Sequence, residues 1–159
     1  MTVDALVELV NGWGTVPRAR AAGRPCPSGG PAPAGALVTL ADRLYPVFAA
    51  RTAVARARLV TALLADCDLR PALRADGDRV RPAWLVPRRR DALLAAAAVA
   101  LHAQLAEHDH DRLGVCASSD CGDVYVDVSP RAHRRYCSLT CQNRERVAAF
   151  RRRSHPAPR

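Results

Sequence analysis

The chain has 159 residues, of which 49% are hydrophobic and 25% charged, and its formal net charge is +9 at pH 7. This length and composition exclude a wholly disordered chain and suit either one ordinary domain or one domain with a small appended module. A membrane span is also excluded, because the strongly apolar run at residues 92–101 is too short to cross a bilayer.

The N-terminus lacks the basic region and the small-residue cleavage site of a signal peptide. We therefore expect a cytoplasmic protein with no membrane partner. The cytosol is reducing, and closely spaced cysteines are more often metal ligands than disulfides there. All 24 basic residues are arginine, and the abundance of Ala, Arg, Gly and Pro, which share GC-rich codons, indicates a bacterium with a GC-rich genome.

The first residues predict a helix, because apolar side chains recur at helical spacing from Val3 to Val10. Asn11 and Gly12 supply a stop signal at the end of this helix. The stretch 17–36 is rich in Pro, Gly and Ala and contains few other apolar residues, so a flexible loop is predicted there.

Two further helices are predicted after the loop. An apolar stripe runs from Leu37 to Leu44, and Pro46 is expected to end or kink this helix, with Val47 and Phe48 continuing a further turn. Thr52 is a suitable cap for the next helix, whose apolar stripe ends at Cys67. Three arginines fall away from that stripe and predict a solvated face: Arg51, Arg56 and Arg58.

A β-hairpin is indicated where Asp76 and Gly77 lie between two runs that contain apolar residues. A proline in each run restricts the pairing of these strands to sheet edges. Asp91 is then expected to cap an alanine-rich helix that extends to about Glu107. Residues 1–112 are thus predicted to form a mainly helical domain with one hairpin.

Residues 1–112 carry no convincing catalytic site. The sequence has no Ser-containing nucleophile elbow, no Gly-rich phosphate loop and no helix with the His-Glu pattern of metalloproteases. His102, His108 and His110 are interpreted as surface histidines near a helix end. Cys26 is expected to be exposed and Cys67 to be a small buried hydrophobe. We therefore do not expect an enzyme.

Four of the six cysteines form two close pairs, Cys116 with Cys121 and Cys137 with Cys141, separated by fifteen residues. Such pairs predict a metal site with four thiolate ligands, and one structural Zn²⁺ is the preferred ion. Four unliganded cysteines and an iron–sulfur cluster are the alternatives, although familiar iron–sulfur spacings place three cysteines close together. A site closed by four cysteines leaves no position for a substrate.

The spacing around these cysteines predicts a treble-clef-like module of a knuckle, a β-hairpin and a helix. The knuckle is 116–121, the alternation at 124–128 is typical of a strand, and 134–137 is expected to return as the second strand. Ser138 is then a suitable helix cap, and residues from 139 onwards have a helical pattern. The whole chain is therefore predicted as an α+β fold that is mainly α.

One row of this last helix is expected to pack on the hairpin, namely Leu139, Asn143, Val147 and Phe150. Because Asn143 is the polar member of the row, we expect its side chain to bond backbone near the knuckle instead of reading a base.

Positive charge is concentrated at the end of the chain, since residues 129–159 hold nine arginines and a single acidic residue, Glu145. A solvated basic surface is the alternative, but this density favours contact with phosphates. The module has few aromatic residues for base stacking, which favours duplex DNA over a single strand. The expected DNA-contacting residues are Arg134, Arg135, Arg144, Arg146, Arg151, Arg152 and Arg153.

The segments Tyr136–Arg144 and Arg146–Arg153 resemble the CGNR zinc finger family, in which two early cysteines precede a Cys-Gly-Asn-Arg signature. The upstream region resembles the accompanying ABATE domain of stress-induced bacterial transcription regulators. The resemblance implies that the four paired cysteines are zinc ligands and that the chain regulates transcription by binding DNA. Gln142 departs from the family, because it stands where the signature has Gly.

These observations predict an ABATE-like domain at 1–112, a zinc finger at 113–154 and a disordered tail at 155–159. The leading hypothesis is a zinc-containing bacterial transcription regulator that binds duplex DNA, associates with the nucleoid and can form a homodimer. One alternative is a zinc-stabilised interaction module that docks acidic partners of the transcription machinery. Another is a thiol redox sensor, motivated by Cys26 and Cys67 beside the cysteine cluster.

Overall fold

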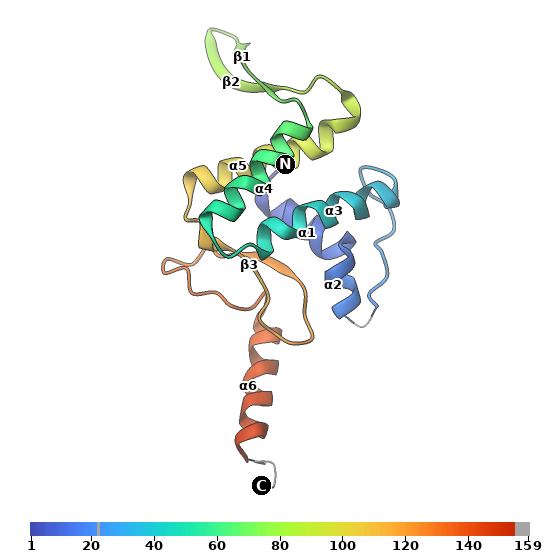
Figure 1. Cartoon of the computed structure of the whole chain (residues 1–159), viewed down its shortest axis with the longest axis vertical. Coiled ribbons are helices and arrows are strands. Elements are labelled where there is room, and N and C mark those ends of the chain that lie inside the picture. Colours follow the sequence, from blue (N-terminus) through green and yellow to red (C-terminus); the bar gives the residue numbers. More distant parts are fainter. Residues whose placement is uncertain (22, 155–159) are drawn as a thin grey trace.

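The computed structural model describes residues 1–21 and 23–154 and consists of a helical body with a projection at each end (Figure 1). The body contains α1 (Val3–Trp13), α2 (Thr15–Arg20), α3 (Ala34–Ala49), α4 (Ala53–Asp66) and α5 (Ala92–Glu107). Two antiparallel hairpins accompany it, β1 (Arg70–Asp76) with β2 (Arg79–Leu85) and β3 (Leu113–Val115) with β4 (Val124–Val126).

Two short 3-10 turns, η1 (Arg89–Asp91) and η2 (His110–Arg112), flank α5, and the final helix is α6 (Leu139–Ser154). The prediction of a mainly helical α+β fold with small hairpins is confirmed. Within the described residues, no helix is both long enough and apolar enough to span a membrane. The predicted disordered tail, 155–159, lies outside the described residues.

Several helix ends follow from local sequence. The Thr52 hydroxyl accepts a hydrogen bond of 3.2 Å from the Ala55 amide, so the predicted cap of α4 is confirmed. Asp91 occupies the position before α5, but its side chain makes no capping bond and pairs with Arg88 instead. Pro46 does not end α3, which continues through it to Ala49.

The loop prediction for 17–36 is wrong at both ends, because α2 extends to Arg20 and α3 begins at Ala34. The start of α2 is fixed by a distant residue. The Asp42 carboxylate accepts hydrogen bonds from the Thr15 amide at 2.7 Å and from the Thr15 hydroxyl at 2.6 Å. A cap supplied by another helix leaves no local signal in the sequence.

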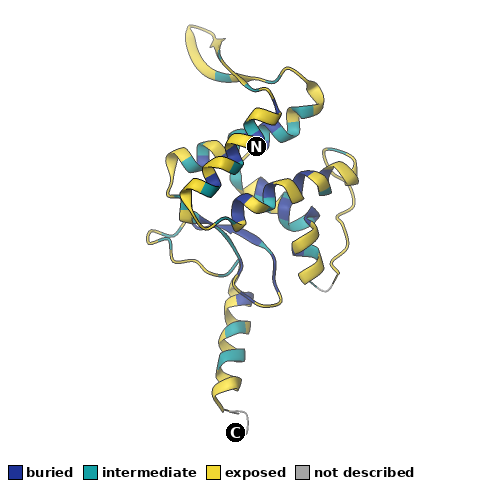
Figure 2. Cartoon of the chain, in the orientation of Figure 1, coloured by how far each residue is buried: buried dark blue, intermediate teal, exposed yellow. Residues whose placement is uncertain are grey.

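A single apolar cluster joins the body to the hairpin β3–β4. Leu6 of α1, Leu44 of α3 and Leu101 of α5 pack in the same cluster as Leu113 and Val124 of the hairpin. All five are fully or almost fully buried. Figure 2 shows buried stretches, in dark blue, on the helices of the body and on this hairpin. A buried side chain of this kind contributes roughly 1.5–3 kcal/mol relative to an exposed one. The hairpin is therefore part of the body's core.

Arg56 is buried within this body, contrary to the solvated face predicted for it. Its side chain is 4% exposed and donates to the carbonyls of Val47 at 3.1 Å, Phe48 at 3.4 Å and Leu113 at 2.5 Å. Hydrogen bonds to carbonyls are the partners a buried guanidinium needs. Arg56 thereby ties α4 to the end of α3 and to β3.

The predicted hairpin β1–β2 is confirmed and forms an arm that projects from the body (Figure 1). Asp76 pairs with Arg79 across a two-residue turn, in which Gly77 has φ of +59°, a value that favours glycine. Near the tip, Leu73 is 75% exposed and Val80 is 64% exposed. The arm therefore contributes little to the core.

Candidate metal centre

The first cysteine pair lies in the turn that connects β3 to β4. The Cys116 amide donates to the Asp123 carbonyl at 2.8 Å, and the Cys121 amide donates to the Ser118 carbonyl at 3.2 Å. The predicted knuckle therefore forms, but it lies inside the hairpin, because the partner of β4 precedes the knuckle. Residues 134–137, which were expected to be the second strand, are not a strand.

Side chains hold the segment that returns from β4 to the second cysteine pair. Asp127 is 2% exposed and accepts hydrogen bonds from the Ser129 amide at 2.8 Å and the Arg134 amide at 2.6 Å. Burial alone would raise the pKa of Asp127, but these hydrogen bonds lower it. The hydroxyl of Tyr125 donates to the Arg134 carbonyl at 2.6 Å. This polar clamp replaces the missing strand pairing.

Arg134 has a structural role in this clamp. Its guanidinium donates to the carbonyls of Val126 at 3.1 Å and Tyr136 at 2.9 Å, and also to that of Cys137. It lies 5.2 Å from the centre of the Tyr125 ring. Most of its donors are thus used inside the module.

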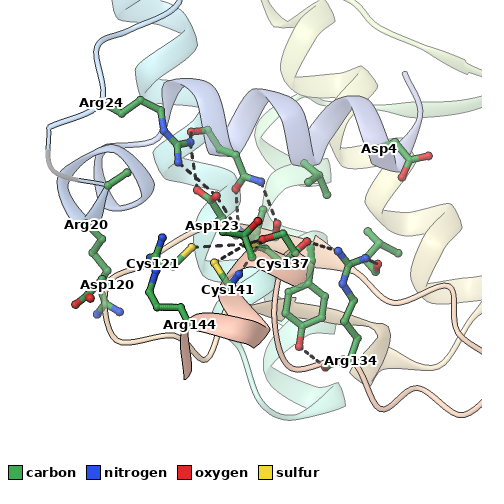
Figure 3. A pocket seen from close by; sticks show the side chains of 18 residues that line it. Asp4, Arg20, Arg24, Asp120, Cys121, Asp123, Arg134, Cys137, Cys141 and Arg144 are labelled. Atoms are coloured by element: carbon green, nitrogen blue, oxygen red, sulfur yellow. Dashed lines mark hydrogen bonds and ion pairs between the residues drawn. The ribbon is translucent and has the colours of Figure 1, made fainter. Parts of the chain in front are cut away.

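The four predicted ligands converge on one point. The sulfur atoms of Cys116, Cys121, Cys137 and Cys141 all lie within 4.8 Å of one another. The sulfur of Cys137 is 3.6 Å from those of Cys121 and Cys141 (Figure 3). Tetrahedral Zn²⁺ with bonds of about 2.3 Å would place its sulfur ligands about 3.8 Å apart. The four cysteines therefore fit one structural zinc ion.

Without a cation, two of the four thiols, Cys121 and Cys137, favour their neutral form. Burial raises the pKa of Cys121 to about 12, and burial also raises the pKa of Cys137. Burial would raise the pKa of Cys141 as well, but hydrogen bonds from Ser138 and Cys137 lower it. A divalent ion ionises coordinating thiols outright, which offsets the cost of burying their charge.

The second cysteine pair lies at the start of α6. The Cys141 amide donates to the Ser138 hydroxyl at 3.2 Å, so the predicted cap is confirmed. Cys137 precedes this cap and Cys141 lies in the first turn, where the positive end of the helix dipole favours thiolates.

Charged side chains surround the cysteines in a groove of about 640 Å³ between α1, α2 and the zinc module. Arg24 pairs with Asp123 at 3.4 Å, and Arg20 and Arg144 also line this groove (Figure 3). Four thiolates with one Zn²⁺ carry two net negative charges, so nearby arginines stabilise the filled site.

Asn11 links α1 directly to the zinc hairpin. Its side-chain oxygen accepts from the Val124 amide at 2.7 Å, and its side-chain nitrogen donates to the Val124 carbonyl at 3.0 Å. The sequence indicated only a helix stop at this residue, whereas α1 continues to Trp13. Nothing local reveals a partner 113 positions away along the chain.

Helix α6 is held to the knuckle along one side. Of its residues, all of which the structure describes, Cys141 alone is buried. Glu145, one turn later, accepts from the Ser118 hydroxyl at 2.9 Å and the Ser119 amide at 3.1 Å. Hydrogen bonds from Ser118 and Ser119 lower the pKa of Glu145. This carboxylate therefore holds α6 against the knuckle.

The row that was predicted to pack on the hairpin is exposed. Leu139 is 75% exposed, Val147 is 49% exposed and Phe150 is 63% exposed, and Asn143 is exposed too. The prediction is wrong because β3 and β4 pack against α1 and α3 instead. In the described residues, the Asn143 side chain makes no hydrogen bond.

The remaining predicted residues lie as follows. Cys26 is exposed and Cys67 is buried, as expected, and neither joins the metal cluster within the described residues. The predicted DNA-contacting arginines are all exposed, namely Arg134, Arg135, Arg144, Arg146, Arg151, Arg152 and Arg153.

Comparison with known proteins agrees with this geometry. Residues 112–154 match the family model of the CGNR zinc finger, a segment that includes all four clustered cysteines and α6. A search of curated proteins gives no match. The predicted resemblance is therefore confirmed for residues 112–154, which carry a zinc finger of the CGNR kind.

Proposed function

We propose that the zinc finger delivers α6 to duplex DNA and that the chain is a bacterial transcription regulator. The observation that carries this proposal is the position of α6, which projects from the body with its arginines exposed (Figure 1). These residues are Arg144, Arg146, Arg151, Arg152 and Arg153.

The arginine side chains of α6 are largely available for contact with phosphates. Among residues 1–21 and 23–154, no ion pair involves any of these five arginines. The one acidic residue of the helix, Glu145, bonds to the knuckle instead. An α-helix of 16 residues is about 24 Å long and fits the major groove of B-DNA.

In this proposal the zinc ion has a structural role. Four cysteine ligands leave no open position on the metal, so the ion would fix the start of α6 and supply no reaction. We accordingly propose a DNA-binding protein and no enzyme.

The regulatory part of the proposal rests on the ABATE-like resemblance of residues 1–112. The body would sense a signal or form a homodimer, and the DNA-bound protein would reside in the cytoplasm with the nucleoid. A shared core between the body and β3–β4 gives a physical path by which a change in the body reaches the zinc finger.

The test is a titration of fluorescent duplex DNA with the zinc-loaded chain at several salt concentrations. Five or six bound phosphates predict a slope of about −4 to −6 for log K against log salt. The variant R151A/R152A/R153A should flatten the slope by about 0.9 for each phosphate that it no longer neutralises. A matched control, R74A/R79A/R81A, removes equal charge from the β1–β2 arm and should leave the slope unchanged. Absent or salt-independent duplex binding would refute the proposal.

A protein-interaction module is the second candidate, and the exposed Val147 and Phe150 of α6 favour it. Acidic partners from the transcription machinery could cover both the apolar and the basic side chains. This candidate predicts a specific protein in a pull-down together with weak duplex binding. The redox-sensor alternative loses support, because Cys26 and Cys67 lie outside the metal cluster.

A further inference from the structure

We infer that α6 reads base pairs in the major groove with one face, formed by Asn143, Val147 and Phe150. This inference rests on the proposed duplex-binding function and assigns a specificity role that phosphate contacts alone do not provide. The sequence pattern instead predicted that this row of α6 packs inward on the hairpin.

The rotation of α6 about its axis is fixed by two anchors. Cys141 belongs to the metal cluster, and Glu145 bonds to Ser118 and Ser119 of the knuckle. Residues four apart lie on the same side of a helix that has 3.6 residues per turn. The side of α6 that carries both anchors therefore always faces the knuckle.

The opposite side of α6 carries the proposed reading face. By the same helical period, Asn143 and Phe150 lie about half a turn from Cys141, and Val147 lies beside them. The exposed fractions of Val147 (49%) and Phe150 (63%) agree with this orientation. A partner that approaches the projecting helix from outside meets these side chains first.

Arginines border this face along both edges. By helical position, Arg146 and Arg153 lie on one edge and Arg151 lies on the other, while Arg144 lies closer to the cysteine groove that it lines. A helix in the major groove lies between two phosphate strands and needs positive charge on both of its flanks. The pattern of α6 is therefore complementary to duplex DNA.

The same charges disfavour a second copy of α6 as the partner. Pairing two apolar faces would bring arginines of both helices together, and like charges at such distances destabilise the pair. The one acidic side chain that could offset them, Glu145, is turned toward the knuckle. Single-stranded nucleic acid is also disfavoured, since Phe150 is the only aromatic residue of α6.

The side-chain chemistry indicates which bases are read. Asparagine forms a bidentate pair with adenine through N6 and N7, and apolar side chains contact the methyl group of thymine. Asn143 and Phe150 lie two turns apart, about 10 Å along the axis, which spans about three base pairs. We therefore expect a recognised step of about three base pairs that contains adenine and thymine.

The experiment selects bound duplexes from a randomised library with the full zinc-loaded chain, and then titrates the selected site and a scrambled duplex. N143A should lower the preference for the selected adenine by about 5-fold to 150-fold, the value of a bidentate pair. V147A/F150A should lower the preference for thymine. Both variants should bind the scrambled duplex within about twofold of the parent. R146A should instead weaken both duplexes equally, as a phosphate-binding residue does.

The outcomes separate the two levels of the proposal. Base reading would be overturned if the selected duplexes shared no sequence, or if the variants kept the base preference of the parent. Either result would leave the proposed phosphate contacts standing. Failure to bind any duplex would overturn the proposed function as well. Zinc content and helicity measured on each variant should match the parent, because all three side chains are exposed. If N143A loses zinc, N143S replaces it, and if V147A/F150A loses zinc, V147T/F150L replaces it. The same shifts in base preference in these substitutes then test base reading.

Discussion

Asn11 joins the helical body to the zinc hairpin through its side-chain amide. It bonds both backbone groups of Val124, whose side chain is itself fully buried. The amide and carbonyl of Val124 lie at a strand edge that is buried against α1, and without Asn11 this donor and acceptor would lack partners. The side-chain amide of Asn11 thus makes the two hydrogen bonds that a neighbouring strand would otherwise provide.

Replacing Asn11 by alanine should therefore lower the free energy of unfolding by about 1–3 kcal/mol, the cost of unsatisfied buried polar groups. Urea unfolding followed by circular dichroism measures this loss. Asn143→Ala is the matched control, because its side chain is exposed, and its effect should stay within about 0.5 kcal/mol. Equal effects for the two variants would contradict the role of Asn11.

The cysteine side chains predict how zinc binding depends on pH. Burial raises the pKa of Cys121 to about 12, so in the zinc-free chain this thiol keeps its proton between pH 5 and 8. Zinc must displace the protons of its ligands, so its affinity should rise with pH across this window and fall toward pH 5. Competition with a chelator of known pH dependence measures this, and a constant affinity would contradict it.

At the scale of elements, α6 is held by very few contacts for a helix of 16 residues. The metal cluster fixes its first turn, and Glu145 fixes the second. Residues 146–154 of α6 extend away from the body (Figure 1). The knuckle and the helix therefore depend on each other for their positions.

Replacing Glu145 by alanine should accelerate the release of zinc to a chelator by about tenfold, as the removal of supporting side chains around metal sites does. Stopped-flow absorbance with a zinc-sensitive dye follows the release. Glu107→Ala removes the same charge from an exposed position on α5 and should have no effect. Identical rates in both variants would show that Glu145 does not hold the knuckle.

Sequence patterns predicted those parts of the site that depend on neighbours along the chain. The spacing of the cysteines, the Ser138 cap and the strand at Val124 are of this kind, and all are confirmed. The pairing partner of that strand was not predictable, because alternation marks a strand without indicating its neighbour. The prediction for the apolar row of α6 is wrong for a related reason, since a stripe such as Val147 and Phe150 predicts contact without indicating the partner.

At the scale of the whole molecule, the zinc finger and the helical body share one hydrophobic core. Leu113 and Val124 flank the knuckle and pack in the same cluster as Leu6 and Leu101. Metal binding is therefore coupled to the folding of the body as well as to that of the finger. A chain cut between 112 and 113 would expose this core on both sides.

Removal of zinc should consequently lower the melting temperature of the helical body by about 5 °C or more, since 1 kcal/mol corresponds to several degrees at this chain length. Trp13, which is 7% exposed and packs against α3, reports on the body by its fluorescence. Trp84→Phe leaves Trp13 as the sole tryptophan of the chain. An unchanged melting temperature after chelation would mean that the finger and the body fold independently.

We propose that a zinc ion holds a basic helix in position for duplex DNA. The most direct test of this claim is the affinity of the chain for duplex DNA, measured by fluorescence anisotropy before chelation, after chelation and after zinc is restored. Without zinc, α6 loses its anchor and must be ordered again on binding, so the affinity should fall by about tenfold and return with zinc. An affinity that is the same in all three states would contradict the claim.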